Sequence, residues 1–131
     1  MPAKCDWTDA SKTIILVSYE GSWTWDEFFA VADKGRELAN SVTHRVDYIL
    51  DMQHGIQPHG GSMLTNSKTV MTQRAANSGI FVTLTTPFVK VMLNVFKSFD
   101  REHGAIMYAA TSIDEAKALI AKVQQKDLVK A

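Results

Sequence analysis

Residues 13–19 read Thr-Ile-Ile-Leu-Val-Ser-Tyr, and this stretch decides the fold class. Its middle is β-branched and apolar without polar alternation, which is typical of a strand that is buried on both faces inside a sheet. Such a strand needs other elements packed on both sides of it. The stretch therefore indicates a layered protein that combines strands with helices.

The flanking sequence extends this pattern in both directions. Residues 4–8 predict a short edge strand, and residues 9–12 predict the turn that pairs it with residues 13–19 as a hairpin. On the other side, Thr24-Trp25-Asp26-Glu27 places a hydroxyl three residues before a carboxylate, a capping box that starts a helix. This helix is expected to end near Asn40.

The strand and helix signals then alternate to the end of the chain. Strands are predicted at residues 46–52, 80–85 and 105–109. Helices are predicted from Ser62 to about residue 77, from Thr86 to about Arg101, and from the second capping box at Ser112 onward. Short connections imply right-handed crossovers. Residues 1–131 are thus expected to form a single α/β domain, with a mixed, mostly parallel sheet of about four or five strands and about four helices.

Charge and composition narrow the classes of partner. Lys and Arg total 14 and balance the 14 Asp and Glu, so no overall field attracts nucleic acid or an anionic membrane. Cys5 is the single cysteine, and no apolar signal segment follows Met1, so a cytoplasmic location is expected. The longest nearly apolar stretch, residues 88–99, is too short and too polar for a transmembrane segment.

Several short sequence segments resemble those of a known family. They are Tyr-Glu-Gly-Ser-Trp-Thr-Trp-Asp-Glu-Phe at residues 19–28, residues 46–52 with Asp51, Pro87-Phe88, and Thr-Ser-Ile-Asp-Glu-Ala at residues 111–116. With the order of elements, they resemble the STAS domain, and more closely its SpoIIAA-like branch of uncharacterised bacterial proteins, whose relatives include lipid-binding folds. The resemblance implies a regulatory domain that acts through protein contacts without a cofactor.

The resemblance also points to Ser62. In STAS proteins that antagonise anti-sigma factors, a serine at the start of the matching helix is phosphorylated by a partner kinase. The matching stretch here is His59-Gly60-Gly61-Ser62, although the Asp-Ser-Ser-Gly pattern usual in that family is absent. Ser62 is therefore a phosphorylation candidate by position.

Residues 51–62 hold the densest group of chemically active side chains. They follow a strand end, where ligands gather in open α/β sheets. Gly60 and Gly61 could form a backbone nest for an anion, or a plain turn with Ser62 as the helix cap. Asp51, His54 and His59 match no established metal motif, so no metal is predicted. Asp51 beside His54 could act as a general base, but no nucleophile motif accompanies the pair.

Two aromatic and apolar features remain. Trp23 and Trp25 flank the first capping box, and we expect one of them to pack against the core and the other to be partly exposed, where it could bind a ligand or partner. The third helix carries an apolar arc wider than one face of a sheet requires. We expect Lys90, Asn94, Lys97 and Arg101 to be solvated. The flank left over for an interface is expected to consist of Val89, Leu93 and Phe96.

Three functions follow in order of preference. The first is a non-enzymatic STAS-like domain that binds a regulatory protein partner and forms a homodimer through Val89, Leu93 and Phe96. The second is a carrier of a small apolar molecule or lipid, with a pocket under the second and third helices and the same flank as its wall or gate. The third is a hydrolase-like enzyme that uses Asp51 and His54. No cofactor and no nucleic acid are expected.

Overall fold

The computed structural model describes residues 3–58 and 60–130, without the side chains of residues 88 and 127–130. The elements follow in the order β1 (Ala3–Trp7), β2 (Ile14–Ser22), α1 (Trp25–Asn40), β3 (Val46–Ile56), α2 (Met63–Thr72), β4 (Ser78–Leu84), α3 (Pro87–Phe99), α4 (Arg101–Gly104), β5 (Met107–Ala110) and α5 (Ile113–Lys130). His59, a predicted loop residue, lies outside the described residues.

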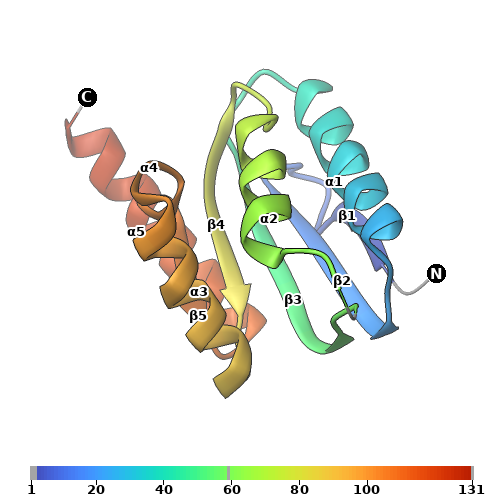
Figure 1. The fold of residues 1–131 in the computed structure, drawn as a ribbon. Helices are drawn as coiled ribbons and strands as arrows, with labels where there is room; N and C mark the ends of the chain where they lie inside the picture. Colours follow the sequence, from blue (N-terminus) through green and yellow to red (C-terminus); the bar gives the residue numbers. More distant parts are fainter. Residues whose placement is uncertain (1–2, 59, 131) are drawn as a thin grey trace.

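The strands form one sheet in the order in which they occur in the chain, β1-β2-β3-β4-β5 (Figure 1). β1 pairs with β2 antiparallel, with Cys5 opposite Val17, and the remaining pairs are parallel. The predicted α/β class, the hairpin and the mixed, mostly parallel sheet are therefore confirmed. The structure has five helices where about four were expected, because a short helix, α4, follows α3.

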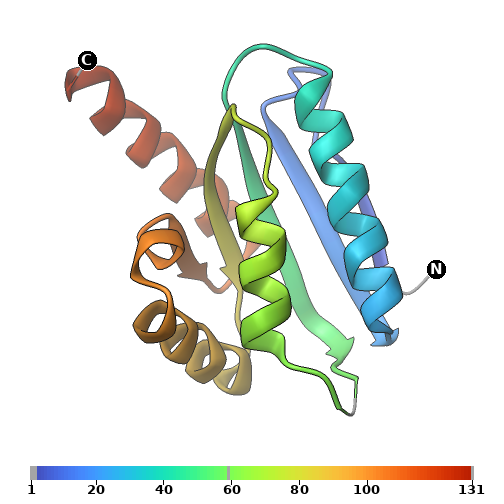
Figure 2. The same ribbon diagram turned by 45° about the horizontal axis from the view of Figure 1, so that its top comes forward.

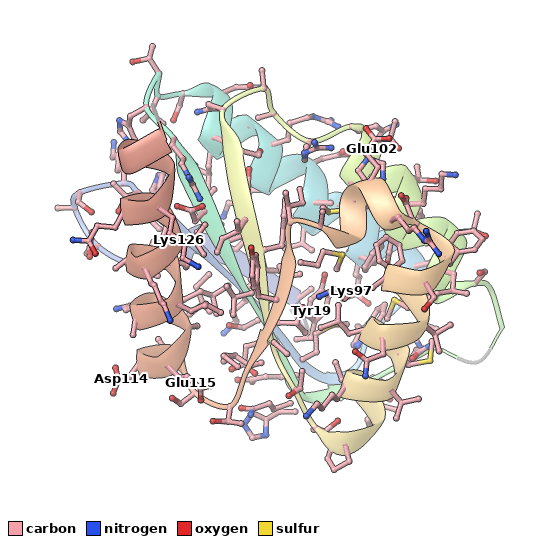
Figure 3. All side chains as sticks on the ribbon, turned by 90° about the vertical axis from the view of Figure 1, so that its left-hand side faces the viewer. Tyr19, Lys97, Glu102, Asp114, Glu115 and Lys126 are labelled. Atoms are coloured by element: carbon pink, nitrogen blue, oxygen red, sulfur yellow. The ribbon has the colours of Figure 1, made fainter. Side chains whose placement is uncertain are left out.

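Consecutive strand order explains the layering. Right-handed crossovers that always step to the next strand in the same direction place their helices on the same face of the sheet. α1 and α2 lie side by side across this face in Figure 2, and α3 lies beyond them near β5. α5 follows the last strand and covers the other face. Figure 3 shows α5, with Asp114 and Lys126, and α3, with Lys97, on opposite sides of the sheet.

Each face of the sheet has its own apolar core. The larger core lies under α1, α2 and α3 and contains Tyr19, Tyr48 and Phe81 from the strands. The smaller core joins Ile49 and Val82 to α5 through its buried residues Ala116 and Ile120. None of the described helices is long and apolar enough to cross a membrane.

Local signals start most helices where they were predicted. Thr24 caps α1 in a complete capping box with Glu27. Ser62 caps α2, and Thr86 caps α3 with a proline in its first turn. In each case the hydroxyl accepts a hydrogen bond from a backbone N–H group that the helix leaves unpaired.

Several boundaries differ from the predictions. β4 begins at Ser78 instead of residue 80, and β5 begins at Met107 instead of residue 105. β3 continues to Ile56 because β2 continues to Ser22, and the two residues pair after an irregularity in register. α2 already ends at Thr72, so Asn77, which was expected to end it, lies outside the helix. Instead, the Asn77 amide donates to the carbonyls of Ala39, Val42 and His44 and so anchors the loop after α1. The predicted third helix stops at Phe99 because Asp100 caps a separate turn, α4.

A buried carboxylate joins α5 to the sheet. Asp47 on β3 is fully buried and accepts hydrogen bonds from the Ile80 backbone N–H at 2.8 Å and from the Gln124 amide of α5 at 2.6 Å. The Arg45 guanidinium lies 3.0 Å from the same carboxylate. Gly79 leaves room for this group, because a Cβ there would collide with Asp47 and Arg45. Buried charges are tolerated only with such partners, so the network determines how α5 docks.

Candidate functional site

A cavity of about 140 Å³ lies between the sheet and helices α1, α2 and α3. Tyr19, Tyr48, Leu50 and Phe81 are among the strand residues that line it, and each of the three helices contributes to the wall. Protein interiors are close-packed, so a cavity of this size inside an apolar core is uncommon. A cavity of roughly 150 Å³ holds a benzene molecule in an engineered protein, which sets the scale of a ligand.

The cavity exists because the helices present small side chains where large ones would fill it. α1 contributes Ala32 and Gly35 to the wall, and α2 contributes Ser67 and Val70. α2 is also only weakly amphipathic, and Met71 is its one buried residue among those described. The weak apolar pattern of this helix was visible in the sequence, but the space that it leaves over the sheet was not.

Two hydroxyls of the mostly apolar wall lack a hydrogen-bond partner among the described residues. They belong to Tyr19 and Thr83, which are 5% and 3% exposed. Burial raises the pKa of Tyr19 well above its usual range, so this phenol keeps its proton at neutral pH. Figure 3 labels Tyr19 on the side of the sheet that faces α3. Buried polar groups normally have partners, so these hydroxyls are available to a bound molecule.

A second hollow of about 110 Å³ adjoins the cavity at the carboxyl edge of the sheet. Its polar lining comes from Gln53 and Gln57 at the end of β3 and beyond it, and from Thr86 at the start of α3, and Trp23 forms another part of its wall. The residues that line both spaces are Met52, Met63, Val89 and Met92. The two spaces therefore lie next to each other, and we call the second one the mouth below. Most of the residues between them are flexible methionines.

An aromatic cluster holds the mouth together. Trp23 is 3% exposed and stacks on Phe28 with ring centroids 5.7 Å apart, and the edge contact between Trp23 and Trp25 is 5.2 Å between centroids. Trp25 is half-buried and donates its indole N–H to the Gly60 carbonyl at 2.9 Å. The prediction that one tryptophan packs in the core and the other is partly exposed is therefore confirmed.

The glycine pair of the loop serves this packing. Gly60 and Gly61 have φ values of 83° and 72°, in the left-handed region that favours glycine. A Cβ at Gly61 would collide with the Trp25 indole. Ser62 is exposed, and its hydroxyl accepts from the Thr65 backbone N–H at 3.1 Å as the cap of α2. The plain turn with a capping serine accounts for these three residues.

The predicted acid–base residues point in different directions. Asp51 is half-buried, pairs in register with Leu84 on the α5 side of the sheet, and accepts from the Gln53 backbone N–H at 3.2 Å. His54 is exposed, and no hydrogen bond joins it to Asp51. Within residues 3–58 and 60–130, no group of three or more His, Cys, Asp or Glu side chains is arranged to hold a metal ion.

The structure corrects the proposed interface on α3. Leu93 and Phe96 are 7% and 3% exposed and line the cavity, and Val89 is half-buried and lines both the cavity and the mouth. They cannot form the exposed flank that was expected. The apolar residues of α3 that are exposed instead are Val91, Val95 and Phe99. The expected solvation of Lys90, Asn94, Lys97 and Arg101 is confirmed.

Comparison of the chain with models of known protein families found no match, and comparison with curated protein sequences found none. The chemistry of the site therefore has to be inferred from its own residues.

Proposed function

We propose that this protein is a non-enzymatic binding domain that holds a small apolar molecule in the cavity under α1, α2 and α3. The observation that carries the proposal is the cavity itself, about 140 Å³ between the sheet and three helices, with the mouth next to it at the carboxyl edge of the sheet. Ligand sites in proteins are typically concave, mostly apolar and lined by a few polar groups, as this one is.

The chemistry of the wall favours an apolar ligand. Aromatic, aliphatic and methionine side chains form most of the lining, and burying apolar surface against them is favourable without directional contacts. The charged side chains of the lining include Asp33 and Arg36, which neutralise each other in an ion pair of 2.9 Å. These two residues therefore offer no unpaired charge to a ligand.

The position of α3 supports the same proposal. Val89, Leu93 and Phe96 would serve as the wall or gate of a carrier, which is the role that the carrier hypothesis gives to this flank. A regulatory function through protein contacts, a homodimer and phosphorylation of Ser62 stay predictions. A homodimer would have to use residues other than the buried Leu93 and Phe96.

Toluene tests the proposal because it matches the size and polarity of the cavity. We expect toluene to raise the thermal midpoint of the wild-type protein, since a ligand at ten times its Kd stabilises the native state by about 1.4 kcal/mol. Val70→Phe places a larger side chain in the cavity wall and should remove the effect. Val91→Phe makes the same change at a position that is 60% exposed and should leave it intact.

A shift of the thermal midpoint that is equal in wild type and Val70→Phe would contradict binding in this cavity. Absence of any shift in the wild-type protein near the solubility limit of toluene would reject the proposed function outright.

A further inference from the structure

We propose that the ligand is amphipathic, with its apolar part in the cavity and a hydrogen-bond-accepting head in the mouth, beside Trp23. The inference rests on the proposed function and adds the class of the ligand and its orientation. It follows from the donors that line the mouth and from the lining residues that the mouth and the cavity share.

The indole of Trp23 is the main reason. Trp23 is 3% exposed and lines the mouth, and its indole N–H has no hydrogen-bond partner among the described residues. The indole nitrogen lies against Gly55, another lining residue, where a Cβ would come within 2.9 Å of it. An indole N–H can only donate, and a buried one usually finds an acceptor. A ligand atom in the mouth can supply that acceptor.

Further donors surround the same space. Thr86 uses its oxygen to accept from the Val89 backbone N–H at 3.3 Å, which leaves its own proton free to donate. The Gln57 side chain is half-buried and has no hydrogen-bond partner among the described residues. In contrast, the Gln53 amide already donates to the Thr111 carbonyl at 3.3 Å. Trp23, Thr86 and Gln57 therefore line one space and have donors that no described residue occupies.

The electrostatic environment of the mouth favours a head group with a negative or partial negative charge. None of the residues that line it, as far as the structure describes them, is charged. Thr86 caps the N-terminus of α3, where the helix dipole and unpaired N–H groups favour an anion or a partial negative charge. A cationic head would find no carboxylate in this lining. A carboxylate or a carbonyl would find donors.

The volumes limit the apolar part. The cavity and the mouth measure about 140 and 110 Å³, which suits one ring or one short chain. Octanoate and octylammonium each contain eight carbons and have heads of opposite charge, so together they separate the contribution of the head from that of the chain.

Calorimetric titration with these two probes tests the inference. We expect octanoate to bind at least about tenfold more tightly than octylammonium at neutral pH. Trp23→Phe keeps the aromatic packing but removes the N–H, and it should weaken octanoate about ten- to a hundredfold, the range expected for one hydrogen bond to a charged group. Trp7→Phe makes the same change at a half-buried residue that lines neither space, and it should leave the affinity unchanged.

Two more variants test whether the head group of the ligand lies in the mouth. Gln57→Leu should weaken octanoate because it removes a donor of the mouth, whereas the matched change Gln125→Leu on the exposed surface of α5 should not. Thr83→Val removes a hydroxyl that lines the cavity but not the mouth, and it should weaken octanoate less than Gln57→Leu does. A loss of octanoate binding in Thr83→Val but not in Gln57→Leu would overturn the orientation.

The two proposals fail in different ways. Equal affinity for octanoate and octylammonium, with toluene still stabilising the protein, would overturn the acceptor head and leave the apolar site in place. If neither toluene nor octanoate binds, the proposed function is wrong and this inference with it. Because Trp23 is a core residue, circular dichroism of Trp23→Phe must match wild type, and Gln57→Leu supplies the decisive result if it does not.

Discussion

Asp100 and His103 form a buried pair where α3 meets α4. The His103 ring nitrogen Nδ1 lies 2.6 Å from one carboxylate oxygen of Asp100, and the His103 backbone N–H donates to the other at 3.2 Å. Both residues are less than one-tenth exposed. The hydrogen bond from His103 holds the pKa of Asp100 below its ordinary value, and Lys68 on α2 contributes to the same shift. This pair therefore stabilises the break between the two helices.

The pair makes a prediction about stability and pH. A carboxylate whose pKa is lower in the folded state adds stability above its unfolded pKa of about 3.9, and this stability is lost as the pH falls through the folded pKa. We expect Asp100→Asn to lower the free energy of unfolding at pH 7 and to flatten its decline below about pH 5. Asparagine can still cap α4, so the change isolates the charge. Chemical denaturation across this pH range provides the measurement.

Glu37→Gln is the control for that prediction, because Glu37 is exposed on α1 and has no hydrogen-bond partner among the described residues. It should leave the acid dependence of stability close to wild type. If Asp100→Asn and wild type lose stability in parallel as the pH falls, the His103 contact does not contribute to the loss of stability at low pH.

At the scale of the element, α3 shows how one helix can divide its apolar residues between two environments. Val89, Met92, Leu93 and Phe96 line the cavity, whereas Val91 and Val95 are exposed. Lys68 covers part of the exposed end, because its amine lies 5.7 Å from the centre of the Phe99 ring. The wide apolar arc of α3 therefore combines a stripe that faces the cavity with one that faces solvent.

Aspartate at two positions of α3 distinguishes these stripes. Leu93→Asp places an unpaired carboxylate in the core and should lower the free energy of unfolding by more than about 3 kcal/mol. Val91→Asp introduces the same group at a position that is 60% exposed and should change it by less than about 0.5 kcal/mol. The double variant Leu93→Asp with Phe96→Asp, which an interface on this flank would turn into a folded monomer, should fail to fold. Urea denaturation and circular dichroism measure these differences, and similar losses in Leu93→Asp and Val91→Asp would contradict this orientation of α3.

The whole molecule is asymmetric about its sheet. One face carries α1, α2, α3 and the short α4, with the cavity between the first three and the strands, and the other carries α5, which Asp47 and Gln124 join to β3. The interior strand β4 is buried along most of its length, whereas α2 buries only Met71 among its described residues. Stability should be distributed unevenly, because segments with few buried contacts open more easily than the core.

Hydrogen exchange should reveal this asymmetry. We expect the amides of α2 to exchange through openings of lower free energy than those of β4, and toluene to slow exchange in α2 by filling the space beneath it. α5 provides an internal control, because it lies on the opposite face of the sheet (Figure 3). Equal slowing of α2 and α5 by toluene would indicate general stabilisation and would contradict a site under α2.

The order of elements, most of the helix starts and the sheet class could be predicted from short stretches of sequence. Thr24 with Glu27, Ser62, and Thr86 with Pro87 act on backbone groups within a few residues, so their effect does not depend on the rest of the chain. The uninterrupted apolar run at residues 14–17 likewise indicated a buried strand before any partner was known. These features are local, which is why the sequence by itself determined them.

The tertiary structure decided how the helices are rotated and what lies between them. The two apolar stripes of α3 would bury similar surface, and only the sheet and the neighbouring helices select Leu93 and Phe96 for the interior. β3 extends to Ile56 because β2 provides a partner for it, which no signal within β3 could indicate. The cavity arises where Gly35, Ala32 and Val70, distant in sequence, leave space over the same strands. The space between elements depends on how the elements are placed relative to each other. The hydrophobic periodicity of a single helix or strand does not contain that information.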